Sequence, residues 1–441
     1  MRDAICVEEL TNTPAIALVN KGFLHDAKQA ASGKGMPNAR IVPETIRCEC
    51  SDLEAIEVGV SAAIDDIIAA LTGPLTEEEK SPKEEIKKHA RIPFKGGLEE
   101  VNRFFYMRGW TDGLPIIPPT EEAVKEMLTG TDLPADYIVT KLVPRMGWVT
   151  VEKIAINAVM AGALPTYLPV LIAAVQTLMD PKSMFYHWGV SNHSYCPFWI
   201  VNGPIRNDLN VASTTGALSP GDIANATIGR AMGLIIKNIG GSRKGMEDMG
   251  VLGNPGKYST VIAEGEENSP WEPLHVEQGL KSEDSAITLA CYNSFIQMWP
   301  YTTDAKGVLN GAIYNIPPAR AGVLTLILNP AHASWLSDDG WTKEEIKTFI
   351  REHTSCPAHR SPKRWWMSKA ATSFNAMDSL ALMATRDDID IIVAGGPGNV
   401  MGLFIGPYVY SLPMITIKVE LPANWEKLVA KYRDMIPQNI T

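Results

Sequence analysis

The chain has 441 residues, which is enough for two or three domains and a large buried core. It is 45% hydrophobic and 20% charged, as globular proteins are, and its net charge of -10 argues against nucleic acid or an anionic membrane as the main partner. No apolar run reaches the roughly 18 residues of a membrane span, and no signal-peptide pattern opens the chain, so we expect a cytoplasmic protein. The six cysteines are scattered, which is typical of reduced thiols.

Residues 1–75 are predicted to form a small, partial parallel α/β module. A helical stretch, Asp3–Leu10, leads into the apolar run Ala15–Val19, which is typical of a buried parallel strand. A helix over Phe23–Ala31 and a strand over Ala39–Val42 follow. A parallel strand is normally fed by a crossover from an earlier strand, so we expect the outer edge of Ala15–Val19 to lack a neighbour.

A long helix closes this module. Ser51 and Glu54 have the spacing of a capping box, which marks the start of a helix. The helix behind it carries apolar residues on one face: Leu53, Ile56, Val60, Ile64, Ile67, Ile68 and Leu71.

A charged linker over residues 76–96 precedes a larger mixed α/β domain, residues 97–441. We predict strands over Phe198–Val201, Ser259–Ala263, Ala286–Leu289, Val323–Leu328, Ile389–Ala394 and Ile415–Val419. We predict helices over Val151–Ala161, Leu168–Met179, Ile223–Lys237, Lys343–Glu352 and Trp425–Met435. The sequence indicates no internal repeat.

Three segments of the first module, "RDAICVEEL", "TPAIALVNKGF" and "KGMPNARIVPE", occur in an order that resembles the UGSC-like (seleno)protein family, named for its selenocysteine-Gly-Ser-Cys motif. The layout is more distantly similar to the selenoprotein B subunit of glycine reductase. The larger domain, with "WTDGLPIIPPT" and "EENSPWEPL", is similar to an uncharacterised region often joined to such modules.

The redox tetrapeptide of that family is absent from this sequence, and its expected place is immediately upstream of Met1. Two explanations stay open. The reading frame begins after a selenocysteine codon, or a separately encoded partner carries the thiol or selenol. The resemblance therefore implies a subunit or truncated form of a thiol- or selenol-dependent redox enzyme.

The segment "AEGEENSPWEPLH" is the first candidate for catalysis. It follows a predicted strand and places Glu264, Glu267 and other carboxylates near His275. Carboxylates that lie close together raise one another's pKa, which keeps a general acid protonated near neutral pH. Trp271 would make the loop partly apolar and is a candidate for substrate binding. The alternative is a solvated acidic loop.

The predicted helix over Ile223–Lys237 has small residues in its first turns, which let backbone N–H groups approach an anion. Asn225 and Arg230 are its candidate substrate-binding residues, and Arg230 suits a carboxylate. Asn157, in "NAVMAGALP", is a further candidate. A tightly packed helix with a structural arginine is the alternative.

Histidines lie near cysteines in "HWGVSNHSYCP" and "HTSCPAHR", and Cys196 is a candidate nucleophile. Paired metal-ligand motifs are absent, so we predict no metal site. The segment "DIDIIVAGGPGN" resembles a ligand loop at a strand end, with Gly395, Gly396 and Gly398 as binding residues. It lacks the spacing of nucleotide-binding loops, and we predict no cofactor.

Three functions remain open. The first is redox chemistry on a small anionic metabolite, with a thiol or selenol supplied upstream or by a partner subunit. The second is a cofactor-free lyase or hydrolase that uses Glu267 and His275 as acid and base. The third is a non-catalytic subunit of a redox complex, and in each case we expect an oligomer. For an enzyme, we expect Arg230, Glu264, Glu267 and His275 to face one cavity with Gly395–Gly398 at its rim.

Overall fold

The computed structural model describes residues 2–33, 36, 38–46, 52–80, 91–300, 302–316, 322–357, 379–381, 386–407 and 412–433. Within these ranges the chain is a mixed α/β protein, as the sequence predicts. No helix in them is long and apolar enough to cross a membrane.

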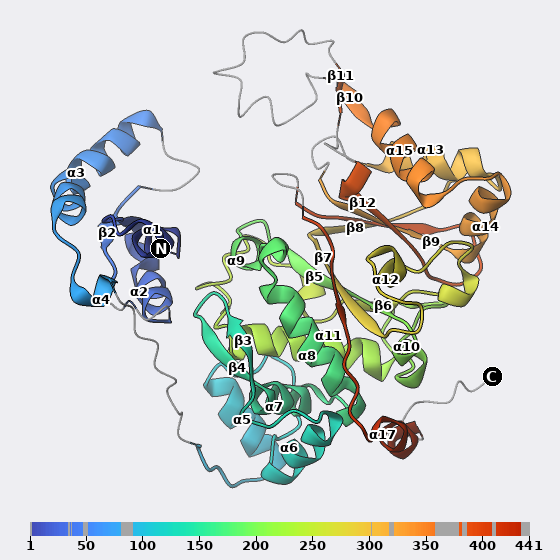
Figure 1. Ribbon diagram of the computed structural model, residues 1–441, viewed down its shortest axis with the longest axis horizontal. Helices are drawn as coiled ribbons and strands as arrows, with labels where there is room; N and C mark the ends of the chain where they lie inside the picture. The colour runs from blue at the N-terminus through green and yellow to red at the C-terminus, as the bar shows by residue number, and fades with distance from the viewer. Residues whose placement is uncertain are drawn as a thin grey trace.

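Two four-stranded sheets of the same design lie at the centre of the larger part of the chain (Figure 1). The first has the order β14 (Ile415–Lys418), β7 (Ala286–Tyr292), β5 (Cys196–Asn202) and β6 (Val261–Ala263). The second has the order β8 (Ser294–Met298), β13 (Met401–Ile405), β9 (Leu324–Leu328) and β12 (Ile389–Val393). In each sheet the last two strands are parallel and the other neighbours are antiparallel.

The two sheets exchange strands. β7 of the first sheet continues through Asn293 into β8 of the second sheet. In the same way, β13 of the second sheet is followed in the chain by β14 of the first sheet. The parallel pair β5–β6 of the first sheet therefore occupies the same position as the parallel pair β9–β12 of the second. At the ends of these pairs Val201 lies beside Ala263, and Leu328 lies beside Val393. This repeat of topology corrects the sequence reading, which finds none.

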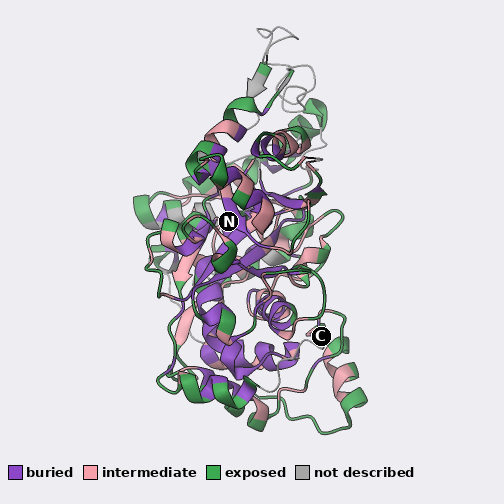
Figure 2. Cartoon of the chain, turned by 90° about the vertical axis from the view of Figure 1, so that its right-hand side faces the viewer, coloured by how far each residue is buried: buried purple, intermediate pink, exposed green. Residues whose placement is uncertain are grey.

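Helices cover the outer face of each sheet, and an apolar core lies between the sheets (Figure 2). The first sheet packs on α7 (Val151–Ala161), α8 (Leu168–Met179) and α11 (Ile223–Asn238). The second packs on α13 (Ala305–Asn315), α14 (Pro330–Asp338) and α15 (Lys343–His353). In the middle the rings of Phe198 and Phe404 stack with centroids 4.3 Å apart. The result is a four-layer α/β/β/α sandwich.

The six strands and five helices predicted for the larger domain are all found, with shifts of a few residues at their ends. Trp425–Met435 is helical over Trp425–Tyr432, as α17, and its last two residues lie outside the described ranges. The other elements are α5 (Leu98–Met107), α6 (Glu121–Met127), β3 (Ile138–Leu142), β4 (Gly147–Thr150), α9 (Phe185–Trp188), α10 (Ile205–Asp208), α12 (Leu274–Glu277), β10 (Ser355–Pro357) and β11 (Ser379–Ala381).

The N-terminal module has the predicted order of elements. These are α1 (Arg2–Thr11), β1 (Ala17–Asn20), α2 (Leu24–Gly33), β2 (Ile41–Glu44), α3 (Leu53–Thr72) and the short α4 (Glu77–Lys80). β1 and β2 are parallel, and β2 is the one strand paired with β1 among the described residues. Helix α3 is capped by Asp52, whose side chain accepts from the N–H of Ala55; the predicted cap residue Ser51 lies outside the described residues.

Candidate functional site

Three segments of the chain meet where the parallel strands of the two sheets end. The N–H of Ala263 donates to the carbonyl of Ala212 at 2.9 Å, and that of Gly265 donates to the carbonyl of Val393 at 2.7 Å. The N–H of Gly395 donates to the carbonyl of Ser213 at 2.8 Å. The loops after β6 and β12 are therefore neighbours, as expected for the Glu264 and Gly395 segments. Carboxyl ends of parallel strands are where α/β proteins commonly bind ligands.

A groove of about 300 Å³ opens on one side of this junction. Thr215–Ser219 and Gly395–Gly398 form two of its walls, and residues on or next to β6, β8, β9, β12 and β13 contribute the rest. All of its lining residues are uncharged. A second cavity, of about 380 Å³, shares Ala217–Ser219 and Phe295 with it and reaches the start of α11.

Several residues that line this groove carry hydrogen-bond donors without a protein partner. Within the described part of the chain, the N–H groups of Gly396 and Gly398 and the hydroxyls of Thr215 and Ser219 make no hydrogen bond. A Cβ atom on Gly396 would lie 1.9 Å from Oγ1 of Thr215, so the close approach of the two walls requires glycine there. Unpaired donors in an uncharged, glycine-lined cleft suit an anionic group.

Glu264 lies at the end of β6 and is completely buried. Its Oε2 accepts from Nδ2 of Asn202 at 2.7 Å and from the N–H of Leu274 at 2.8 Å. Nζ of Lys343 lies 3.8 Å from Oε1. Burial raises the pKa of Glu264 in spite of this cation and these donors. A raised pKa was expected from neighbouring carboxylates, but burial is the main cause.

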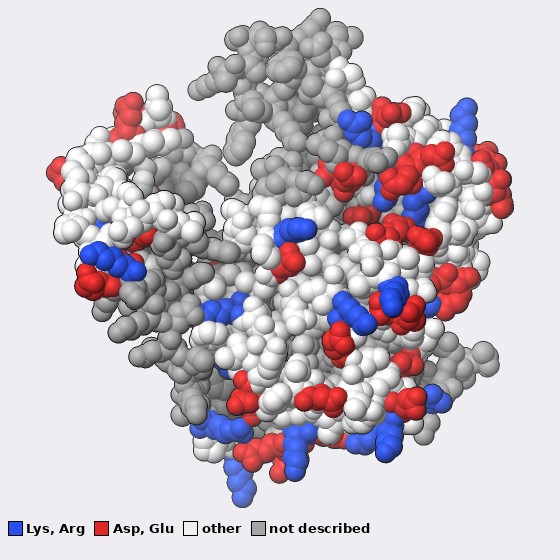
Figure 3. All heavy atoms as spheres, viewed as in Figure 1, with Lys and Arg blue, Asp and Glu red and all other residues white. Residues whose placement is uncertain are grey.

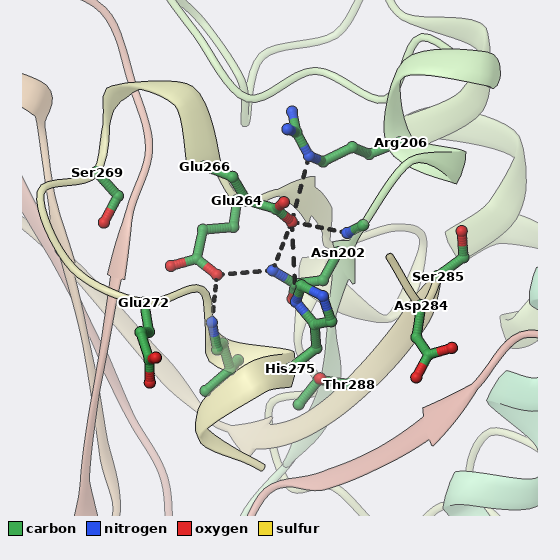
Figure 4. A network of polar contacts seen from close by, with 12 residues as sticks. Asn202, Arg206, Glu264, Glu266, Ser269, Glu272, His275, Asp284, Ser285 and Thr288 are labelled. Atoms are coloured by element: carbon green, nitrogen blue, oxygen red, sulfur yellow. Dashed lines mark hydrogen bonds and ion pairs between the residues drawn. The ribbon is translucent and has the colours of Figure 1, made fainter. Parts of the chain in front are cut away.

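Four nitrogen atoms surround one oxygen of the neighbouring Glu266, two of them as hydrogen-bond donors (Figure 4). The N–H of Gly203 lies 2.7 Å from Oε1, and Nδ2 of Asn202 lies 3.0 Å from it. Nε of Arg206 is 3.2 Å away and Nδ1 of His275 is 4.0 Å away. This carboxylate therefore balances the charge of Arg206 inside the cluster.

Glu267, which the sequence presents as an acid, has a different role. Its side chain is 60% exposed and forms an ion pair with Nη2 of Arg206. The hydrogen bond from Arg206 lowers the pKa of Glu267 to about 2, so the group is ionised near neutral pH and cannot donate a proton there. This corrects its assignment as a general acid.

His275 is fully buried on α12, beside the cluster. Neither ring nitrogen makes a hydrogen bond within the described part of the chain. Oδ1 of Asn202 and Oε1 of Glu264 are also buried without such a bond there. Buried polar atoms are nearly always paired, so several unpaired atoms in one cluster mark it as a candidate for chemistry.

The thiol of Cys196 is not an activated nucleophile. Burial raises its pKa to about 12, and burial also raises the pKa of Cys291. Neither thiol is a thiolate at neutral pH. Burial and the raised pKa therefore do not favour Cys196 as a nucleophile, and its catalytic role stays a prediction.

Arg230 lies apart from the Glu264 cluster. Its Nε and Nη2 donate to the carboxylate of Asp112 at 2.8 and 3.0 Å, and Nη2 also donates to the carbonyl of Pro115 at 2.7 Å. It holds a loop of the "WTDGLPIIPPT" segment onto α11. Arg230 therefore has the structural role that the sequence left as the alternative.

The other three candidates also make structural contacts. Oδ1 of Asn225 accepts from the N–H of Ala212, and its amide donates to Val261, although the residue also borders the second cavity. Asn157 accepts from the side chain of Asn238 at 2.8 Å. Nε1 of Trp271 donates to the carbonyl of Trp341 at 3.0 Å. This bond holds the acidic loop against the turn between α14 and α15, the helices that pack on the second sheet.

Sequence reasoning missed Asn202, Arg206, Lys343 and Thr215 as site residues. One signal was present, because "NGP" after an apolar segment marks the loop that begins at Asn202. Lys343 lies at the start of α15, on the second sheet, and Thr215 lies in a segment without helix or strand. No local sequence pattern predicts that either residue reaches the junction of the two sheets. Across the described ranges, no three His, Cys, Asp or Glu side chains gather in a group that could hold a metal ion.

No family model, curated protein or solved structure matches the chain. The assignment of the candidate site therefore depends on the geometry described above.

Proposed function

We propose that the larger part of the chain is an enzyme that binds a small anionic metabolite in the groove and uses Glu264 for proton transfer. One observation carries this proposal. The junction of Ala212–Ser213, Ala263–Gly265 and Val393–Gly395 places a donor-lined, uncharged groove next to a buried carboxyl group with a raised pKa.

The chemistry that this arrangement supports is acid–base catalysis. A carboxyl group that stays protonated can donate a proton to a leaving group, and the same group can accept one in the reverse direction. Ile262 of β6 lines the groove, and Glu264 follows two residues later, directly after the strand ends. The reaction class is therefore that of a lyase or hydrolase.

Redox chemistry with a thiol or selenol stays a prediction from the family resemblance. Cys196 and Cys291 have raised pKa values, so neither supports that role. A nucleophile from a partner subunit is the form of the redox hypothesis that agrees with these values.

The test is binding of small anions to the full chain. We expect inorganic phosphate, acetate or succinate to raise the melting temperature of the wild type in thermal denaturation. Thr215→Val should weaken binding of the effective anion about tenfold, because a hydrogen bond to a charged group contributes roughly 1.5–3 kcal/mol. Gly396→Ala should abolish binding, because its methyl group would occupy the wall contact with Thr215.

Thr72→Val is the matched control, since its hydroxyl donates only to the carbonyl of Ile68 within α3. Equal responses of the wild type and Thr215→Val to every anion would contradict the groove assignment. Glu264→Gln should leave binding intact while it removes turnover, which separates the binding claim from the catalytic claim.

A further inference from the structure

Helix α3 exposes an unusual amount of apolar surface. Leu53, Ile56, Val58, Val60, Ile64, Ile68 and Leu71 have exposed fractions between 37% and 72%. An apolar stripe on a helix normally faces a core. Here it faces outward.

Small residues on one flank of the stripe form the side of α3 that packs on the module. Gly59 and Ala63 are the buried residues of the helix. A Cβ atom on Gly59 would lie 2.3 Å from Cγ1 of Ile46, so α3 lies directly on the segment after β2. The C-terminal end is also fixed, because Nη1 of Arg40 donates to the carbonyl of Gly73 at 2.8 Å. The outward orientation of the stripe follows from these contacts.

The charges of α3 are all acidic. Glu54, Glu57, Asp65 and Asp66 are its charged residues, and it has no Lys or Arg. At about 100° per residue, Glu54 and Asp65 lie along one edge of the stripe and Glu57 lies within it. In Figure 3 this part of the surface is mostly white with acidic patches.

We propose that the outward stripe of α3 docks a basic amphipathic helix of a partner protein. Amphipathic helices bind partners through residues spaced as Val60, Ile64, Ile68 and Leu71 are. Lysine or arginine beside the apolar face of the partner would pair with the acidic edge. A second copy of this chain would bring two acidic edges together, and an anionic membrane would be repelled by them.

The probe is a synthetic helical peptide of leucine and lysine heptads, labelled for fluorescence anisotropy and titrated with the full chain. Ile64→Ser/Ile68→Ser should weaken binding at least tenfold, because it removes apolar contact without a change in charge. Glu57→Gln/Asp65→Asn should weaken binding and reduce its salt dependence. Leu252→Ser is the control, because Leu252 is 97% exposed and lies outside α3.

Several results would overturn the proposal. One is equal binding of the peptide by the wild type and Ile64→Ser/Ile68→Ser, which would mean that the peptide is held by net charge alone. Another is a dimer mass in light scattering that Ile64→Ser/Ile68→Ser converts to a monomer mass, which would assign the stripe to a second copy. Flotation of the wild type with neutral vesicles, lost in that variant, would assign it to a lipid surface.

Discussion

Glu264 combines complete burial with a carboxyl group whose charged form is disfavoured. Since its pKa in the folded state is raised, the protonated group stabilises the fold at low pH, and this contribution is lost as pH rises through the folded-state pKa. Glu264→Gln imitates the protonated group at every pH. We therefore expect the variant to gain stability relative to the wild type as pH increases above the ordinary value of about 4.5.

The measurement is urea unfolding of both proteins between pH 5 and pH 8. Glu345→Gln is a suitable control, because Glu345 lies on the exposed cap of α15 and its pKa is lowered by the hydrogen bond from the N–H of Thr342. A constant difference in the free energy of unfolding between wild type and Glu264→Gln would mean that Glu264 is ionised in the folded and unfolded states alike over this range, which would contradict its raised pKa.

Part of the candidate site could be predicted from the sequence. It placed Glu264 and His275 in one segment, and the structure keeps them in one cluster. It could not separate Glu264 from Glu267, because their difference depends on Asn202 and Arg206, more than fifty residues earlier in the chain. Arg230 likewise reads as a ligand for a carboxylate, and only its contact with Asp112 shows that the carboxylate belongs to the chain itself.

At the scale of elements, α11 anchors the loop at Trp110–Pro115. Arg230 binds Asp112, Nζ of Lys237 donates to the carbonyl of Thr111 at 2.7 Å, and Asn238 donates to Trp110. Breaking a partly buried, two-pronged ion pair leaves a charge without its partner. We expect Arg230→Ala to reduce the free energy of unfolding by about 2 kcal/mol and to leave anion binding unchanged.

Chemical denaturation and anion titration of the same variant distinguish the two roles. Asp112→Asn should produce a similar loss of stability, since it removes the other half of the pair. Weaker anion binding by Arg230→Ala without a loss of stability would restore Arg230 to the site and would be inconsistent with the anchor role.

The elements that the sequence predicts well are those with a long apolar run or a clear cap. α7 begins after Thr150, whose side chain accepts from the N–H of Lys153, and both of its ends match the prediction. β8 and β13 are missed because their apolar runs contain polar residues or glycine. They pair in the second sheet with strands that are distant in the chain, and no local sequence pattern predicts this pairing.

At the scale of the whole molecule, the two halves share one topology but differ in chemistry. The loop after β6 carries Glu264 and Glu266, whereas the corresponding loop after β12 carries Ala394 and Gly396. The loop after β6 therefore supplies carboxylates, and the loop after β12 supplies small residues that line the groove. This difference explains why the repeat is invisible in the sequence: the matching loops serve different functions in the proposed site.

The central claim is that an anion binds in the groove at the junction of the two halves. The most direct measurement is the anomalous difference map of crystals soaked in arsenate, a phosphate analogue with a strong anomalous signal. The account predicts a peak within hydrogen-bond distance of Gly396 and Thr215 that is absent in Gly396→Ala crystals. A peak only at surface lysines, or an equal peak in Gly396→Ala, would contradict it.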